Sequence, residues 1–180
     1  AKTGGNYENR NEWKVSAGEL QIVGVGSTFT QNTAGASLLV DGAFEMGSVS
    51  DTSLQNFTLT NGTVDGTFQF RRTALTLNSA VTVAPSTVMT VQGDNIGDNT
   101  LTGDVPSGLT IELRIAGTSD GAFLSTTGPV TNYGTVNVIS GGGYIPNGAY
   151  GKLTATSGAF TNAGTLSLNA SASGSGGYAN

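Results

Sequence analysis

Short runs of alternating apolar and polar residues recur along most of the chain, and Gly, Asn, Pro or Ser closes nearly every run. In the clearest run, residues 110–115, Ile111, Leu113 and Ile115 alternate with polar residues. Successive side chains of a strand point to opposite faces, so one face of this run would be apolar. The turn residues follow one another too closely for helices, and the pattern predicts an all-β fold. Residues 7–18 are the one segment in which a helix is conceivable.

The joints between the runs favour a parallel β-solenoid over other all-β folds. Between residues 75 and 91, three short runs are separated by joints that suit bends better than hairpins. Three strands joined by bends make one coil of a parallel β-solenoid, or β-helix, in which each coil stacks its apolar residues on the next. Asn61-Gly62 and Asn147-Gly148 are dipeptides that hairpins prefer, so an antiparallel β-sandwich or jelly roll stays open as the alternative.

Charge is distributed unevenly and suggests how the chain is divided. All twelve carboxylates lie between Glu8 and Asp120, and Lys152 is the only charged residue from position 121 onward. Valine and leucine in this last third supply apolar residues for an ordered core. We expect an N-terminal arm at 1–18 that could connect subunits, one β-rich domain at 19–170, and a Gly/Ser-rich tail at 171–180.

The residues that the chain lacks exclude several functions. It has no Cys and no His, which removes disulfides, thiolate nucleophiles, zinc sites built on these ligands and Ser-His or Cys-His catalytic pairs. A net charge of −5 and a single adjacent basic pair, Arg71-Arg72, argue against nucleic acid. No apolar run approaches the roughly 20 residues of a membrane span. We therefore expect no enzyme activity, no cofactor and no catalytic or metal site. An export signal would already have been removed.

Two groups of acidic residues are candidate sites. The segment 93–99 with Asp94, Asp98 and Asp104 offers oxygen atoms of the kind calcium binds, but it lacks a calcium-loop pattern, and turn formation is the simpler interpretation. Glu112 and Arg114 share one strand face, so we expect a surface ion pair there. Glycoside hydrolysis would need two paired carboxylates, and nothing marks partners among Asp41, Glu45, Asp51, Asp65 and Glu112.

Threonine and aromatic residues are candidate binding surfaces. A regular array of Thr-x-Thr pairs on a flat sheet would suit ice binding, but the pairs recur at unequal intervals that fit no single coil length. We interpret them as ordinary solvent-facing threonines of strands. Tyr133, Tyr144 and Tyr150 could line a sugar-binding platform, although loop packing explains them as well; Trp13 could anchor the N-terminal arm. The Thr-x-Thr pairs are Thr28/Thr30, Thr58/Thr60, Thr100/Thr102 and Thr154/Thr156.

One internal repeat is clear. The pattern Thr-Asn-x-Gly-Thr-apolar-x-apolar occurs at 131–138 and again at 161–168, with an insert-like Gly-rich segment at 141–148 between the copies. We expect the Asn to hydrogen-bond within its turn, the Gly to take a positive φ, and the following residues to enter a strand with their apolar pair inward.

This repeat resembles those in the β-helical passenger regions of bacterial autotransporters and filamentous-haemagglutinin-type adhesins, over roughly residues 73–170. The resemblance implies a secreted, right-handed β-helix that works in adhesion or extracellular matrix on a bacterium, usually without catalysis. The chain is shorter than such passengers, and the segment before Gly66 lacks the repeat, so a small subunit is the better expectation.

These observations together predict a secreted, non-enzymatic structural protein. Open coil ends present unpaired backbone groups, and the last third lacks the charges that block strand pairing. We expect copies of the chain to assemble into an extracellular fibre or surface layer that supports adhesion or biofilm, with a cell-surface glycan as a further partner. The first alternative is a monomeric glycan- or ice-binding module, and the second, less favoured, is a polysaccharide-active enzyme.

Overall fold

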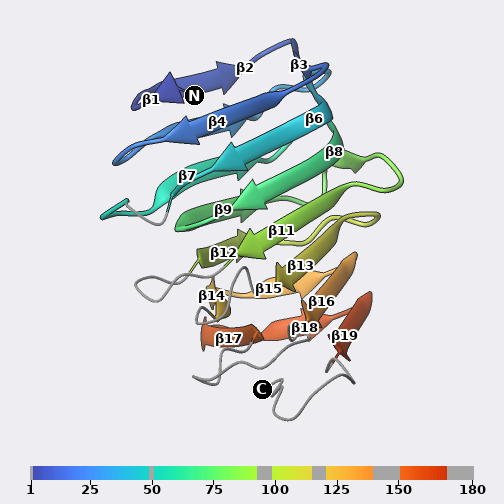
Figure 1. Ribbon diagram of the computed structural model, residues 1–180. Helices are drawn as coiled ribbons and strands as arrows, with labels where there is room; N and C mark the ends of the chain where they lie inside the picture. The colour runs from blue at the N-terminus through green and yellow to red at the C-terminus, as the bar shows by residue number, and fades with distance from the viewer. Residues whose placement is uncertain (1, 49–50, 93–98, 115–120, 140–150, 170–180) are drawn as a thin grey trace.

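The computed structural model shows a parallel β-solenoid (Figure 1). It describes residues 2–48, 51–92, 99–114, 121–139 and 151–169. These residues form strands, turns and bends without a helix, and every described pairing between strands is parallel. Parallel pairing throughout confirms the predicted solenoid and excludes the antiparallel sandwich for this part of the chain.

The first sheet contains ten of the described strands and lies toward the viewer in Figure 1. Its main order is β1-β4-β6-β8-β11-β13-β16-β19, with β3 beside β6 and β10 beside β8. The strands are β1 (Lys2–Thr3), β3 (Glu12–Val15), β4 (Glu19–Val23), β6 (Ser37–Met46), β8 (Thr63–Phe70), β10 (Thr82–Val83), β11 (Val88–Gln92), β13 (Thr110–Arg114), β16 (Thr135–Ile139) and β19 (Thr165–Asn169).

The second sheet lies behind the first and contains one strand from each successive coil, in the order β2-β5-β7-β9-β12-β14-β17. A two-stranded sheet of β15 (Val130–Asn132) and β18 (Phe160–Asn162) joins the sheets in the last two coils. The strands of the second sheet are β2 (Asn6–Asn9), β5 (Thr28–Gln31), β7 (Gln55–Leu59), β9 (Thr73–Leu77), β12 (Asn99–Gly103), β14 (Ala122–Thr127) and β17 (Gly151–Ser157).

Residues 6–15, inside the segment expected as an arm, form strands of the solenoid instead of the helix considered for 7–18. β2 pairs with β5, which sets Tyr7 beside Phe29, and β3 pairs with β6, which sets Trp13 beside Leu38. Both aromatic side chains pack on the core. Alternation of apolar and polar residues therefore continues into this segment and builds a first coil. Its use as a connector between subunits stays a prediction, and the expected tail at 171–180 lies outside the described residues.

Phenylalanine rings fill the core of the N-terminal half. The Phe57 ring lies stacked on Phe29 with centroids 5.3 Å apart, and 4.8 Å from the Phe70 ring. Phe44 and Phe68 also contact the Phe57 ring, and all five side chains are fully buried. Further along the axis the same interior rows contain aliphatic residues, among them Met89, Val91, Ile111, Leu113, Val136 and Val138.

Buried amide side chains bond the backbone at the corners between strands. Asn132 lies in the first copy of the repeat, and its Oδ1 accepts a hydrogen bond from the Gly134 N–H at 3.1 Å, as expected. Its Nδ2 donates to Asn162 Oδ1 at 2.8 Å and to the Thr165 carbonyl at 2.9 Å, both in the next coil. The equivalent asparagines of the two repeats thus connect neighbouring coils.

The glycine of the repeat serves a different purpose from the predicted one. Gly134 and Gly164 are absent from the glycines with positive φ, so that prediction is wrong. A Cβ on Gly134 would instead collide with the carbonyl oxygens of Leu109 and Pro106, and one on Gly164 with the carbonyl oxygen of Gly134. Glycine is needed here because adjacent coils approach too closely for a side chain.

Coil length varies although strand pairing is continuous. In the second sheet, the register partners Asn56 and Ala74 are separated by a short coil, whereas Ser125 and Thr154 are separated by a much longer one. Strands from coils of different length therefore still lie side by side.

Candidate functional site: two sheet faces and the open ends

A row of threonines crosses the outer face of the second sheet. Thr30, Thr58, Thr76 and Thr102 are register partners on consecutive strands, and the Thr102 and Thr127 hydroxyls are 2.5 Å apart. The intervening residues of these strands, such as Phe57 and Leu75, are buried, so the threonines face outward. Beside this row runs a second one, formed by Thr28, Asn56, Ala74 and Thr100.

The expectation that the Thr-x-Thr pairs share no regular array is therefore wrong in part. It assumes one fixed coil length, whereas the coils differ in length and still align Thr28/Thr30 with Thr100/Thr102 on one face. The array is not perfect, since Asn56 and Ala74 interrupt the second row. Thr60 follows the end of β7, so only Thr58 of that pair joins the row. β17, which carries Thr154 and Thr156, pairs with β14 through a register shift.

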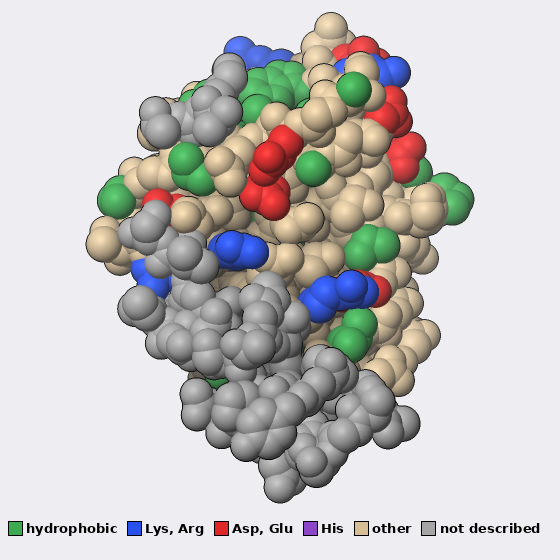
Figure 2. Space-filling model, viewed as in Figure 1, with side chains coloured by type: hydrophobic (Ala, Val, Ile, Leu, Met, Phe, Trp, Pro, Cys, Tyr) green, Lys and Arg blue, Asp and Glu red, His purple; other side chains and the backbone are tan. Residues whose placement is uncertain are grey.

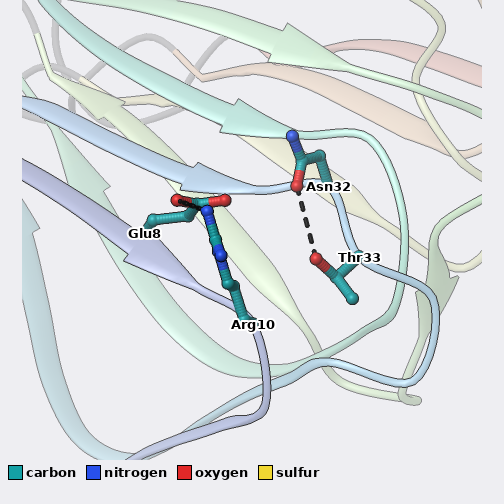
Figure 3. A network of polar contacts seen from close by, with 4 residues as sticks. All are labelled: Glu8, Arg10, Asn32 and Thr33. Atoms are coloured by element: carbon teal, nitrogen blue, oxygen red, sulfur yellow. Dashed lines mark hydrogen bonds and ion pairs between the residues drawn. The ribbon is translucent and has the colours of Figure 1, made fainter.

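A shallow hollow of about 540 Å³ lies at the N-terminal end of this face, between β2, β5 and β7. Amide, hydroxyl and carboxylate groups surround it. Glu8 on its rim forms an ion pair with Arg10, whose Nη2 lies 2.8 Å from Glu8 Oε2 (Figure 3). This hydrogen bond lowers the pKa of Glu8. The hollow is lined by Asn6, Tyr7, Glu8, Thr28, Thr30, Asn56 and Thr58.

The corner that follows β5 is shown in the same view. There the Thr33 hydroxyl donates to Asn32 Oδ1 at 3.4 Å, a long hydrogen bond between adjacent residues (Figure 3). Because the contact is local to the corner, we interpret it as part of the corner and not of the hollow.

The two ends of the solenoid leave apolar side chains incompletely covered. In the last coil, Leu166 and Leu168 lie directly beside Val136 and Val138, continue the interior rows, and are 40% and 57% exposed. In the first coil, Tyr7, Trp13, Val15 and Leu20 are only partly buried against the core. The interior rows therefore reach both ends of the described solenoid.

Four of the five candidate carboxylates have a described contact, each with a different partner. Asp41 lies 3.6 Å from Lys14 Nζ, and buried Asp51 accepts hydrogen bonds from the Ser48 N–H and Gln55 Nε2. These are structural contacts at the surface and at a corner. Asp65 is half-buried in β8. The predicted ion pair of Glu112 and Arg114 is confirmed at 3.1 Å.

Sequence reasoning misses the acidic pair that does form. Glu45 accepts a hydrogen bond from Gln21 Nε2 at 3.0 Å. A side-chain hydrogen bond between Glu45 and Glu19, together with the charge of Glu45, raises the pKa of Glu19. Nothing in the sequence singles out Glu19, because its proximity to Glu45 depends on the register of β4 with β6. The hydrogen bond with Glu45 and the like charge of Glu45 both favour the protonated form of Glu19.

The remaining candidate residues are only partly described. Asp104 Oδ1 accepts a hydrogen bond from the Thr131 N–H at 3.0 Å, which connects Asp104 to β15 in the next coil. Asp94, Asp98, Tyr144 and Tyr150 lie outside the described residues. Tyr133 is 47% exposed after β15. Among the residues that are described, no three acidic side chains gather into a group that could hold a metal ion.

The fold defines the class of protein, a parallel β-solenoid, and the comparisons with known proteins go no further. No family model, no curated protein and no solved structure matches the chain. None of the described residues belongs to a helix with the length and hydropathy that a membrane span requires.

Proposed function

We propose that this protein is a non-enzymatic structural protein that assembles end to end with copies of itself. We further propose that it does so as a secreted component of an extracellular fibre or surface layer in adhesion or biofilm, as its likeness to autotransporter passenger repeats suggests. The observation that carries the proposal is the last described coil, where Leu166 and Leu168 continue the core rows and are exposed.

The last coil has the properties of an edge that accepts further strands. β19 and β17 end their sheets in the described structure, and an edge strand has unpaired backbone groups along one side. Proteins commonly protect such edges with charge, but β19 contains no charged residue. At the other end, Trp13 and Val15 of the first sheet and Tyr7 of the second are partly buried and offer an apolar surface against which the leucines of a second copy would pack. Parallel pairing would then continue from one copy into the next.

The test replaces both exposed leucines with aspartate in the full chain. Leu166→Asp with Leu168→Asp places two charges on the proposed contact, and we expect it to convert assemblies into monomers. Ser167→Asp is the matched control, because Ser167 lies between them on the opposite face of β19. Light scattering and negative-stain electron microscopy report assembly, and circular dichroism reports the fold. A wild-type chain that stays monomeric, or a double variant that still assembles, would contradict the proposal.

The threonine row favours ice as the ligand of a second candidate function. Strands of a sheet lie about 4.7–4.9 Å apart and alternate residues about 6.6 Å apart, spacings of the same order as repeats in the oxygen lattice of ice. β5, β7, β9 and β12 contain no charged residue, and β-branching restricts the threonine side chains to few rotamers. A rigid, uncharged array of hydroxyl and methyl groups is suited to ordering water.

Ice recrystallisation in the presence of the protein tests this second candidate. Thr76→Tyr puts a bulky ring at the centre of the row and should abolish any inhibition of crystal growth, while tyrosine is well tolerated in strands. Thr67→Tyr, on the exposed face of the first sheet, is the control and should keep wild-type activity. Wild-type protein that leaves ice growth unchanged would eliminate this candidate.

A further inference from the structure

A groove crosses the outer face of the first sheet where β8, β11 and β13 lie side by side. It has a volume of about 320 Å³ and is open to solvent along the sheet. Viewed from this sheet, the molecule shows a few charged side chains set among uncharged ones (Figure 2). Charged residues are only 11% of the chain, and Glu112 and Arg114 both line the groove. Its other lining residues are Thr67, Gln69, Val88, Thr90 and Gln92.

Hydrogen bonds between strands hold the polar groups of the groove in place. Gln92 Oε1 accepts from Arg71 Nε at 2.6 Å, and Gln92 Nε2 donates to Gln69 Oε1 at 3.0 Å. Arg114 is the register partner of Gln92 on the other side, and its side chain is 58% exposed. Gln92 therefore stands between Arg71, which follows the end of β8, and Arg114 at the end of β13.

The chemistry of these groups matches an acidic sugar. A guanidinium group binds a carboxylate through two parallel hydrogen bonds, and carboxamide groups donate to and accept from hydroxyls. Glu112 adds an acceptor for hydroxyls on the same surface. Because hydrogen bonds already fix Arg71, Gln92 and Gln69, little conformational entropy of these three side chains would be lost on binding. An open groove on a sheet can also accept a segment from within a long polymer.

We propose that this groove binds a carboxylate-bearing saccharide, of the kind found in uronate-containing polysaccharides. The proposal rests on the adhesive part of the proposed function, for which it supplies a ligand class. Arg114 would bind the carboxylate with the N–H donors that its ion pair with Glu112 does not use. Arg71 would attract a second acidic group along the polymer, and Gln69 and Gln92 would bind hydroxyls.

Titration calorimetry with polygalacturonate, and with dextran as the neutral polymer, tests the proposal on the full chain. We expect binding of polygalacturonate only, weakened about tenfold or more by Arg114→Gln. Arg114→Lys should bind polygalacturonate nearly as weakly as Arg114→Gln, since lysine keeps the charge but not the bidentate geometry. Arg10→Gln is the matched control, because Arg10 also pairs with a glutamate two residues earlier on an exposed surface, and it should bind as wild type.

Each result decides for or against the groove. Equal binding of dextran, no binding of polygalacturonate by the wild-type chain, or equal losses in Arg114→Gln and Arg10→Gln would overturn the proposal. Repeating the titration with the Leu166→Asp, Leu168→Asp variant separates saccharide binding in the groove from assembly of the chain. Binding that survives in a monomer supports the groove whatever the fate of the fibre, and assembly without binding refutes the groove alone.

Discussion

The coils around β5–β8 and the coils around β15–β19 share one backbone plan but hold it with different interactions. In the first region, five fully buried phenylalanines pack ring against ring. In the second, the interior residues are aliphatic, asparagines bond one coil to the next, and the final leucines are exposed. In a solenoid each coil contacts only its neighbours, so stability is close to a sum of local terms. We therefore expect the local free energy of unfolding to fall from the aromatic coils toward the last described coil.

The largest expected effect comes from the centre of the aromatic region. Phe57→Ala removes a fully buried ring that contacts four other phenylalanines and should cost about 3–5 kcal/mol of unfolding free energy. Leu168→Ala, in the exposed last coil, should cost less than about 1 kcal/mol. Urea denaturation of both variants measures the two costs. Equal costs would mean that the coils do not differ in stability as proposed.

Next in size is the loss of the asparagine that joins the last two coils. Asn132→Ala leaves the Gly134 N–H and the Thr165 carbonyl without their side-chain partner and should cost about 2–3 kcal/mol. The equivalent change in the exposed copy, Asn162→Ala, should cost about 0.5 kcal/mol. Hydrogen exchange should show the loss confined to β15–β19. Loosening that reached β5 would contradict nearest-neighbour stability.

A stabilising change is expected where the C-terminal half places a hydroxyl in an apolar row. Thr126 lies beside Leu101 and is fully buried, and its hydroxyl has no hydrogen-bond partner within the described residues. Thr126→Val keeps the shape and removes the buried hydroxyl, so it should raise stability by about 1 kcal/mol. Thr127→Val, at the exposed neighbour, is the control and should give no gain. A loss of stability in Thr126→Val would show that the hydroxyl is bonded after all.

The smallest effect concerns charge in the N-terminal coils and depends on pH. Glu45 raises the pKa of Glu19, so the folded state holds this proton more tightly than the unfolded state does. The free energy of unfolding that the Glu19–Glu45 pair contributes therefore decreases as the pH rises through the raised pKa of Glu19. Glu19→Gln should increase Tm slightly at about pH 7 and leave it unchanged at about pH 3.

Glu8→Gln provides the control of opposite sign. Arg10 lowers the pKa of Glu8 in the folded state. The contact therefore stabilises the fold at a pH above the pKa that Glu8 has in the unfolded chain, and this stabilisation disappears as the pH falls through the lowered pKa. The variant should therefore lower Tm slightly at neutral pH. Changes of the same sign in both glutamate variants would rule out the electrostatic explanation.

The strands of this fold could be predicted from the sequence, because alternation marks which face of each strand is buried. The coil foreseen over residues 75–91 is present as β9, β10 and β11. Asn61-Gly62 is typical of a hairpin, yet it forms the corner between β7 and β8 in different sheets, where Gly62 has φ +82°. A positive φ serves a corner as well as a hairpin, so the dipeptide alone does not distinguish them.

The candidate surfaces were harder to predict than the strands. The row through Thr30, Thr58 and Thr76 depends on which residues become register partners, and that depends on how many residues each corner contains. The same holds for the groove around Gln92 and for the contact of Glu19 with Glu45. Side-chain alternation is encoded within a few residues, whereas alignment between coils is settled only when the interior rows pack.

The short distance in sequence between paired strands also bears on how quickly the chain can fold. Each strand of the second sheet finds its partner a single coil further along the chain, so no pairing there requires closing a long loop. The phenylalanine coils are the natural nucleus, and later coils would add to them in order, each on an edge already formed. Pulse-labelled hydrogen exchange during refolding should protect β7 and β8 before β16 and β19. Synthesis from the N-terminus would then deliver the strands in the order in which they are needed.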